Sequence, residues 1–147
     1  MIYLKIDEEG RVIFPYSPST LKRENPNISF PDPIDENTLL RFNVHRVTET
    51  TVPDFDGATH QPRQSAELID GVWTQVWTVV ELSLTLASDN VRRLRDSYLS
   101  ESDWTQIPHN PLSPEDETAW ANYRELLRQI PQQTGFPYSV QWPSKPQ

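Results

Sequence analysis

Fourteen of the 147 residues are proline, about twice the usual share of a protein. Proline lacks a backbone N–H and clashes with the preceding helical turn, so it ends helices and is excluded from the interior of sheets. We therefore expect much of the chain to be extended or looped. Five Trp, five Tyr and five Phe argue against wholesale disorder, because disordered chains are poor in aromatic residues. Order should concentrate around these side chains.

The formal net charge of −8 opposes binding to nucleic acid or to an anionic membrane surface, since both need clustered Lys and Arg. The cluster Arg92, Arg93 and Arg95 is followed at once by Asp96, which indicates a solvated helix face. With no cysteine, disulfides and thiolate metal sites are excluded, as is common in a reducing cytoplasm. The sequence has neither a signal-peptide pattern nor an apolar run of about 18 residues, so we expect a soluble protein.

The first 47 residues predict a small β-rich fold with short helices. Residues 2–6 alternate apolar and polar side chains, residues 7–10 supply a turn, and residues 11–16 run apolar again, which indicates a β-hairpin. One or two helical turns should start at Ser19 or Thr20 as N-cap and end before Pro26. A second short helix should begin at Asp35, and residues 44–47 should form a strand.

Residues 49–63 have no periodicity and predict a surface loop. Two β-rich runs then flank Asp70-Gly71, a dipeptide that suits a type I′ hairpin turn, in which both central residues need positive φ. Both faces of the second run carry apolar side chains, so we expect this strand to be covered on both sides. For Trp73 and Trp77 we favour cross-strand core packing over an exposed binding platform.

The last third predicts a helical hairpin. Apolar residues at helical spacing indicate one helix from about Ala87 or Ser88 to Leu99. A second helix should start with Ser113 as N-cap and Pro114 at its first position, and Pro131 should end it. An extended tail with two aromatic-proline pairs follows, over residues 135–147; it either packs back on the protein or awaits a partner.

No pattern of catalytic residues emerges. The chain has no G-x-S-x-G elbow, and four glycines leave no phosphate-binding loop. The three histidines, His45, His60 and His109, are scattered singly, without the spacing of a metal site. Turn chemistry and helix capping explain the acidic runs at residues 7–9 and 115–117 more simply than acid–base catalysis does. We expect no cofactor, no metal and no enzymatic activity.

Residues 92–146 resemble the bacteriophage tail assembly chaperone family. The resemblance is carried by ordered blocks at compatible spacing: Arg95-Asp96, Asp103-Trp104-Thr105-Gln106, Pro111-Leu112, Trp120, Tyr123-Arg124, Leu127-Arg128, Ile130-Pro131, Gly135-Phe136-Pro137 and Trp142-Pro143. It implies a non-enzymatic chaperone that binds a phage tail fibre protein, expected to be a trimer, and assists its folding or trimerisation. It also implies action in the host cell cytoplasm during phage assembly. Two alternatives are a structural tail component that stays in the virion and an enzyme with an unrecognised N-terminal site.

Interface hot spots favour Trp, Tyr and Arg, which makes the aromatic blocks of this module the candidate partner-binding residues. They are Phe136, Tyr138, Trp142, Trp104, Trp120, Tyr123 and Arg124. Within this set we expect Trp104, Trp120 and Tyr123 to belong to the core, with Asp103 capping the turn that it begins.

The predicted fold class is α+β. A small N-terminal antiparallel β-rich unit with short helices, residues 1–83, should be followed by residues 84–147, a helical hairpin with an extended C-terminal tail.

Overall fold

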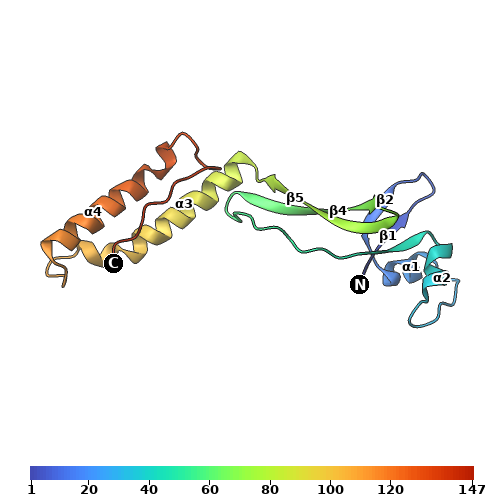
Figure 1. Cartoon of the computed structure of the whole chain (residues 1–147). Helices are drawn as coiled ribbons and strands as arrows, with labels where there is room; N and C mark the ends of the chain where they lie inside the picture. Colours follow the sequence, from blue (N-terminus) through green and yellow to red (C-terminus); the bar gives the residue numbers. More distant parts are fainter. The chain divides into compact units, whose positions relative to one another are not determined.

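The computed structural model describes residues 1–147 and confirms the α+β class (Figure 1). The chain divides into two compact units. Unit 1 comprises residues 1–54 and 62–79, and unit 2 comprises residues 55–61 and 80–147. The two long strands β4 (His60–Ile69) and β5 (Val72–Glu81) contribute residues to both units.

A three-stranded antiparallel sheet forms the base of unit 1. Its strands are β1 (Ile2–Ile6), β2 (Val12–Tyr16) and β3 (Val44–Val47), in the order β2-β1-β3. The predicted N-terminal hairpin and the strand at 44–47 are therefore confirmed. The side chain of Asp7 closes the hairpin turn, because its Oδ1 accepts from the backbone N–H of Glu9 and of Arg11 at 3.0 and 2.8 Å.

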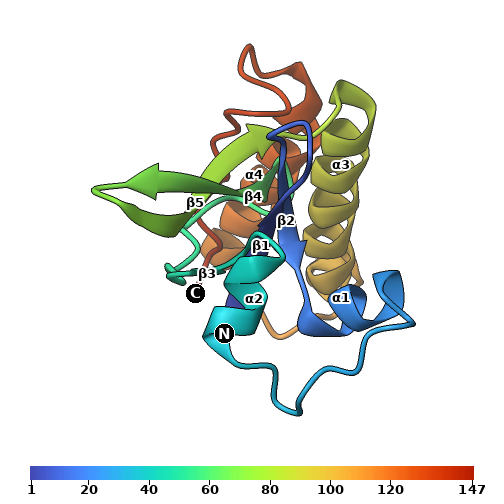
Figure 2. The ribbon, with the colours of Figure 1, turned by 90° about the vertical axis from the view of Figure 1, so that its right-hand side faces the viewer.

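Two short helices cover this sheet and carry its apolar core. They are α1 (Pro18–Glu24) and α2 (Glu36–Arg41), joined by a wide loop that Figure 2 shows at one end of the unit. The predicted Asp35 cap of α2 is confirmed, since Asp35 accepts from Thr38 N. Tyr16, Leu21, Leu39 and Val44 form the buried cluster.

The predicted N-cap of α1 is wrong. Ser17, and neither Ser19 nor Thr20, is the capping residue, and its Oγ accepts from Thr20 N at 3.1 Å. The reason lies in Pro18, whose fixed φ and missing N–H suit the first helical position and so move the cap one residue before it.

The Asp70-Gly71 hairpin between β4 and β5 is confirmed. Asp70 has φ 49° and Gly71 φ 79°, the positive values that a type I′ turn requires. On its other edge β5 meets Thr48: Thr48 N donates to Trp73 O, and Gln75 N donates to Thr48 O, at 2.8 and 2.9 Å. Over this stretch both edges of β5 are hydrogen-bonded. The predicted loop at 49–63 is wrong for its last four residues, because β4 begins at His60; Thr50, in the remaining part, is hydrogen-bonded to Gln75.

Gln75 is a buried polar side chain whose role could not be predicted from the sequence. Its Nε2 donates to Gln64 Oε1 at 2.9 Å, and its Oε1 accepts from Thr50 N at 3.1 Å. The amide thus joins the neighbouring strand β4 to the segment that follows β3. Trp73 and Trp77 on the same strand are half-buried, and Trp77 Nε1 donates to Thr50 O at 3.3 Å.

Unit 2 is a helical hairpin. It contains α3 (Leu84–Glu101), the 3-10 turn η1 (Asp103–Gln106), α4 (Pro114–Gln129) and the 3-10 turn η2 (Ile130–Gln132). The Ser113 cap of α4 is confirmed. Helix α3 begins earlier than predicted, because Ser83 caps it by accepting from Leu86 N.

Two substitutions test the turn assignment. Gly71→Ala should lower the free energy of unfolding by about 1 kcal/mol, because a β-carbon is strained at positive φ although space is free around it. Gly57→Ala is the matched control, since its added carbon meets only Phe55, at 3.9 Å, and should change stability by less than about 0.5 kcal/mol. Urea denaturation measures both, and equal losses would contradict the type I′ assignment.

Acid should weaken unit 1. The hydrogen bond from Lys5, followed by that from Tyr16, lowers the pKa of Glu24; bonds from Arg11 lower the pKa of Asp7, and bonds from Thr38 lower that of Asp35. A carboxylate with a lowered folded-state pKa contributes stability above its unfolded pKa of about 4, and this is lost as pH falls through the folded pKa.

The urea midpoint should therefore fall between about pH 5 and pH 3. Glu24→Gln should flatten this dependence. Glu8→Gln is the control, because the Glu8 carboxylate makes no hydrogen bond or ion pair within the chain and its removal should leave the pH profile unchanged.

Candidate functional site

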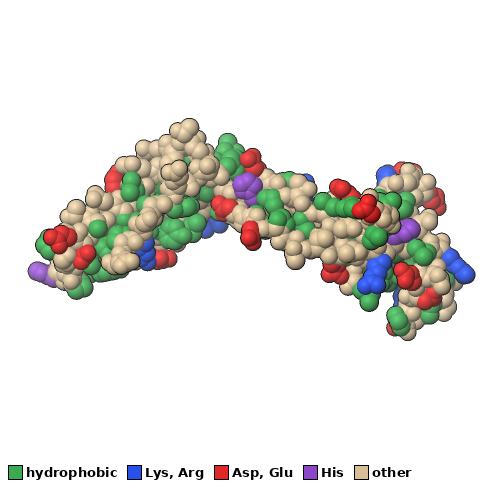
Figure 3. All heavy atoms as spheres, viewed as in Figure 1, with side chains coloured by type: hydrophobic (Ala, Val, Ile, Leu, Met, Phe, Trp, Pro, Cys, Tyr) green, Lys and Arg blue, Asp and Glu red, His purple; other side chains and the backbone are tan.

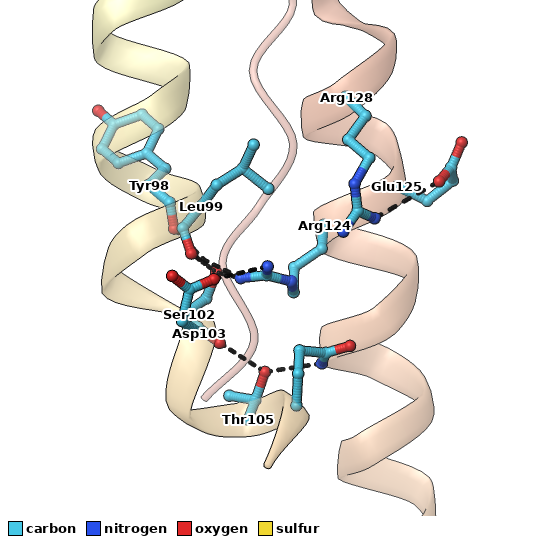
Figure 4. Close-up of polar contacts among 9 residues, drawn as sticks. Tyr98, Leu99, Ser102, Asp103, Thr105, Arg124, Glu125 and Arg128 are labelled. Carbon is cyan, nitrogen blue, oxygen red and sulfur yellow. Dashed lines mark hydrogen bonds and ion pairs between the residues drawn. The ribbon is translucent and has the colours of Figure 1, made fainter.

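Arg124 of α4 joins the two helices of the hairpin at the end where α3 stops and the connection to α4 begins (Figure 4). Its side chain is 8% exposed. One terminal nitrogen, Nη1, donates to Leu99 O and to Ser102 Oγ, and the other, Nη2, donates to Asp103 Oδ1 at 2.7 Å. The last carbonyls of a helix have no partner inside the helix, and a cation near them is favourable. Arg124 thus caps the C-terminus of α3 from the opposite helix.

Two hydroxyl groups complete this cap. The Ser102 hydroxyl donates to Tyr98 O and Leu99 O, at 2.8 and 3.0 Å, and the Thr105 hydroxyl donates to Ser102 O at 2.7 Å. Both residues are buried. The prediction that Asp103 caps its own turn is wrong: η1 has no side-chain cap, because the Asp103 carboxylate is engaged by Arg124.

The predicted aromatic core of this module is confirmed for Trp120 and Tyr123 and wrong for Trp104. Trp120 and Tyr123 are buried and meet edge to face, with ring centroids 5.7 Å apart. Burial raises the pKa of the Tyr123 phenol. The ring centroids of Trp104 and Trp120 are 5.9 Å apart, yet Trp104 is 44% exposed. The one-turn helix η1 places Trp104 outside the α3–α4 interface.

The C-terminal tail packs back on unit 2. Tyr138 donates its hydroxyl to Leu82 O at 2.7 Å, and the Arg92 guanidinium lies 5.2 Å from the Phe136 ring centroid. Trp142 meets Tyr98 edge to face at 5.4 Å. All three tail aromatics are half-buried.

A tight turn starts the tail. Ser139 N donates to Gly135 O at 2.7 Å, and a β-carbon on Gly135 would lie 2.3 Å from Ser139 O. Only glycine fits this approach of the backbone. The Gln133 side chain then makes two hydrogen bonds to the backbone of Gln141, a pair that we call the Gln133 grip. It donates to the carbonyl at 2.9 Å and accepts from the N–H at 2.8 Å. Sequence reasoning missed this grip, because nothing in the pattern marks one glutamine among several.

The structure divides the seven predicted partner-binding residues into two groups. Trp120, Tyr123 and Arg124 are buried within the hairpin, whereas Trp104, Phe136, Tyr138 and Trp142 keep part of their surface accessible. Whether these residues bind a partner stays a prediction. Sequence reasoning did not single out the exposed apolar side chains Ile107 and Leu126.

The chemistry of the surface suits protein contact. Figure 3 shows apolar side chains gathered along the drawn face of the helical hairpin and acidic ones where α4 begins; the acidic residues are Glu115, Asp116 and Glu117. No group of three or more His, Asp or Glu side chains comes together in an arrangement that could hold a metal ion. None of the helices combines the length and apolarity needed to span a membrane.

Part of the chain matches a known protein family. Residues 88–147 match the family described as phage tail assembly chaperone protein, which confirms the resemblance found in the sequence and supports a role in tail assembly. The matched residues begin inside α3 and include α4 and the whole tail. No curated protein and no solved structure gives a significant match.

Arg124→Ala should destabilise unit 2 by about 2–4 kcal/mol, because it removes the charged donor that links the Leu99 carbonyl, the buried Ser102 hydroxyl and the Asp103 carboxylate to α4. Arg128→Ala is the control on the same helix: its side chain is 52% exposed and pairs with Glu125 at 3.6 Å, which contributes at most about 1 kcal/mol. Thermal denaturation followed by helical circular dichroism measures both, and similar losses would show that the cap is not the main stabilising contact.

Proposed function

We propose that this protein is a non-enzymatic chaperone of phage tail fibre assembly, which binds the fibre protein and assists its folding or trimerisation. The observation that carries the proposal is the family match over residues 88–147. It would act in the host cell cytoplasm during assembly, and it would need no cofactor and no nucleic acid.

The physical problem that such a protein addresses is slow β-pairing. Long, intertwined β-rich trimers form through contacts distant in sequence, so their strand edges and apolar faces stay exposed while they fold. A net charge of −8 keeps an accessory protein soluble while it covers such surfaces. Exposed apolar side chains on unit 2, among them Trp104 and Ile107, supply contact area.

Strand addition is a second means of contact. Over residues 73–75 both edges of β5 are occupied, by β4 and by Thr48. The outer edge of β4 has no strand beside it and is the free edge in this two-stranded sheet. Pairing with a strand of the fibre protein would use it in the manner of β-augmentation.

Co-expression tests the proposal. The fibre gene of the same phage is expressed with and without this protein, and soluble SDS-resistant trimer is quantified. We expect trimer to form only in its presence, and equal trimer yields would contradict the proposal. Mass spectrometry of purified particles then separates a released chaperone from a structural component, because only the latter is present in stoichiometric amount.

A matched pair of variants locates the contact. Ile107→Ser, at an apolar residue that is 56% exposed inside the matched region, should lower trimer yield severalfold. Leu84→Ser, at one that is 63% exposed outside this region, should leave it unchanged. If both variants assist as well as the native protein, the η1–α4 loop is not the contact surface.

A further inference from the structure

The last eight residues, 140–147, form a segment that we call the strap. It runs between α3 and α4, as Figures 1 and 4 show. Trp142 is its anchor: the ring packs on Tyr98 of α3 and on the buried cluster of α4 around Trp120 and Tyr123. The strap therefore lies in a groove whose two walls are the helices of the hairpin.

The strap is held loosely. Beyond the Gln133 grip on Gln141, no hydrogen bond within the chain joins residues 142–147 to the helices. Lys145 makes an exposed ion pair with Glu101 at 3.8 Å and lies 5.9 Å from the Trp120 ring centroid. Exposed ion pairs contribute little to stability, so aromatic packing is the main force that keeps the strap in place.

The segment before the strap is held firmly. Pro137 is fully buried, and Tyr138 is hydrogen-bonded to Leu82 O. Release of the strap would consequently stop near residue 139 and leave the helical hairpin and its Arg124 cap intact. Segments with few backbone hydrogen bonds and a single packing anchor open at the lowest free energy.

The space on the α4 side of the strap is not filled. A hollow of about 470 Å³ lies beside Trp142 and Pro143, and Leu126 on its wall is 51% exposed. The remaining lining consists of four glutamines, residues 129, 132, 133 and 141. The hollow is uncharged, with an apolar wall and amide groups that can both donate and accept.

We propose that this groove is a binding site for an extended segment of a partner protein, with an aromatic-proline pair followed two residues later by Lys or Arg. In the unbound protein the strap, with Trp142-Pro143 and Lys145, occupies the site as a placeholder. The inference rests on the packing of unit 2 and holds whether or not the partner is a tail fibre.

Three features select this class of segment. Tyr98 and the cluster around Trp120 can pack against a flat ring at the position of Trp142, and Glu101 can pair with a cation at the position of Lys145. The helices offer no row of free backbone groups, so the bound segment need not form a β-strand. A proline-containing segment is already extended, so it loses little entropy on binding. A partner whose side chains also fill the hollow would gain contacts that the strap lacks.

The test uses the protein of residues 1–147 and a fluorescent peptide with the strap sequence Val140–Gln147. Trp142→Ala removes the anchor of the resident strap, and fluorescence anisotropy should then show the peptide binding at least tenfold more tightly than to the native protein. The same peptide with alanine at the Trp position should not bind. Leu84→Ala, an exposed α3 control, should bind the peptide as weakly as the native protein does.

A second variant keeps the aromatic packing. Lys145→Glu turns the attraction to Glu101 into repulsion and should tighten peptide binding about threefold. If Trp142→Ala loses its helical circular dichroism and is therefore unfolded, peptide binding to Lys145→Glu tests the proposal in its place. Folded variants that bind the peptide no better than the native protein would overturn the proposal. A native dimer that disappears in Trp142→Ala would also overturn it, by assigning the groove to the strap of a second copy. None of these outcomes bears on fibre trimer yield, so the two proposals fail separately.

Discussion

The guanidinium of Arg124 sets the geometry on which the helical hairpin depends. A helix of 18 residues such as α3 ends with carbonyl groups that its own backbone cannot satisfy, and here they lie at the interface with α4. Arg124 meets this requirement from the facing helix, so one side chain both caps α3 and fixes where α4 lies against it. The exposed carboxylate of Asp103 orients the guanidinium without being buried itself.

The sequence predicts best where local chemistry decides the structure. The Asp70-Gly71 turn, the Asp35 cap and the Ser113-Pro114 start of α4 each follow from the φ requirement or hydrogen bond of one or two residues. Even there the neighbour matters, as Pro18 shows by moving the cap of α1 to Ser17.

Sequence reasoning fails where distant segments meet. The burial of Trp120 and Tyr123 followed from helical periodicity, whereas the exposure of Trp104 depends on the short helix η1, which has no periodicity to read. The task of Asp103 depends on Arg124, twenty-one residues away. Gln75 is held by Thr50, twenty-five residues away, and by Gln64, eleven residues away. No composition or spacing rule distinguishes it from the exposed glutamines, and the same is true of Gln133, although its partner Gln141 is only eight residues away.

The buried amide of Gln75 limits which changes of sequence the β4–β5 hairpin can accept. Successive residues of a strand face opposite sides, so losing one residue of β5 between the turn and Gln75 would turn the amide away from both Gln64 and Thr50, and losing one residue of β4 between Gln64 and the turn would turn Gln64 away from the amide. Substitutions at the exposed positions of the hairpin leave this match intact, while single-residue insertions and deletions destroy it. The number of residues in these two strands should therefore be more strictly constrained than the identity of their exposed side chains.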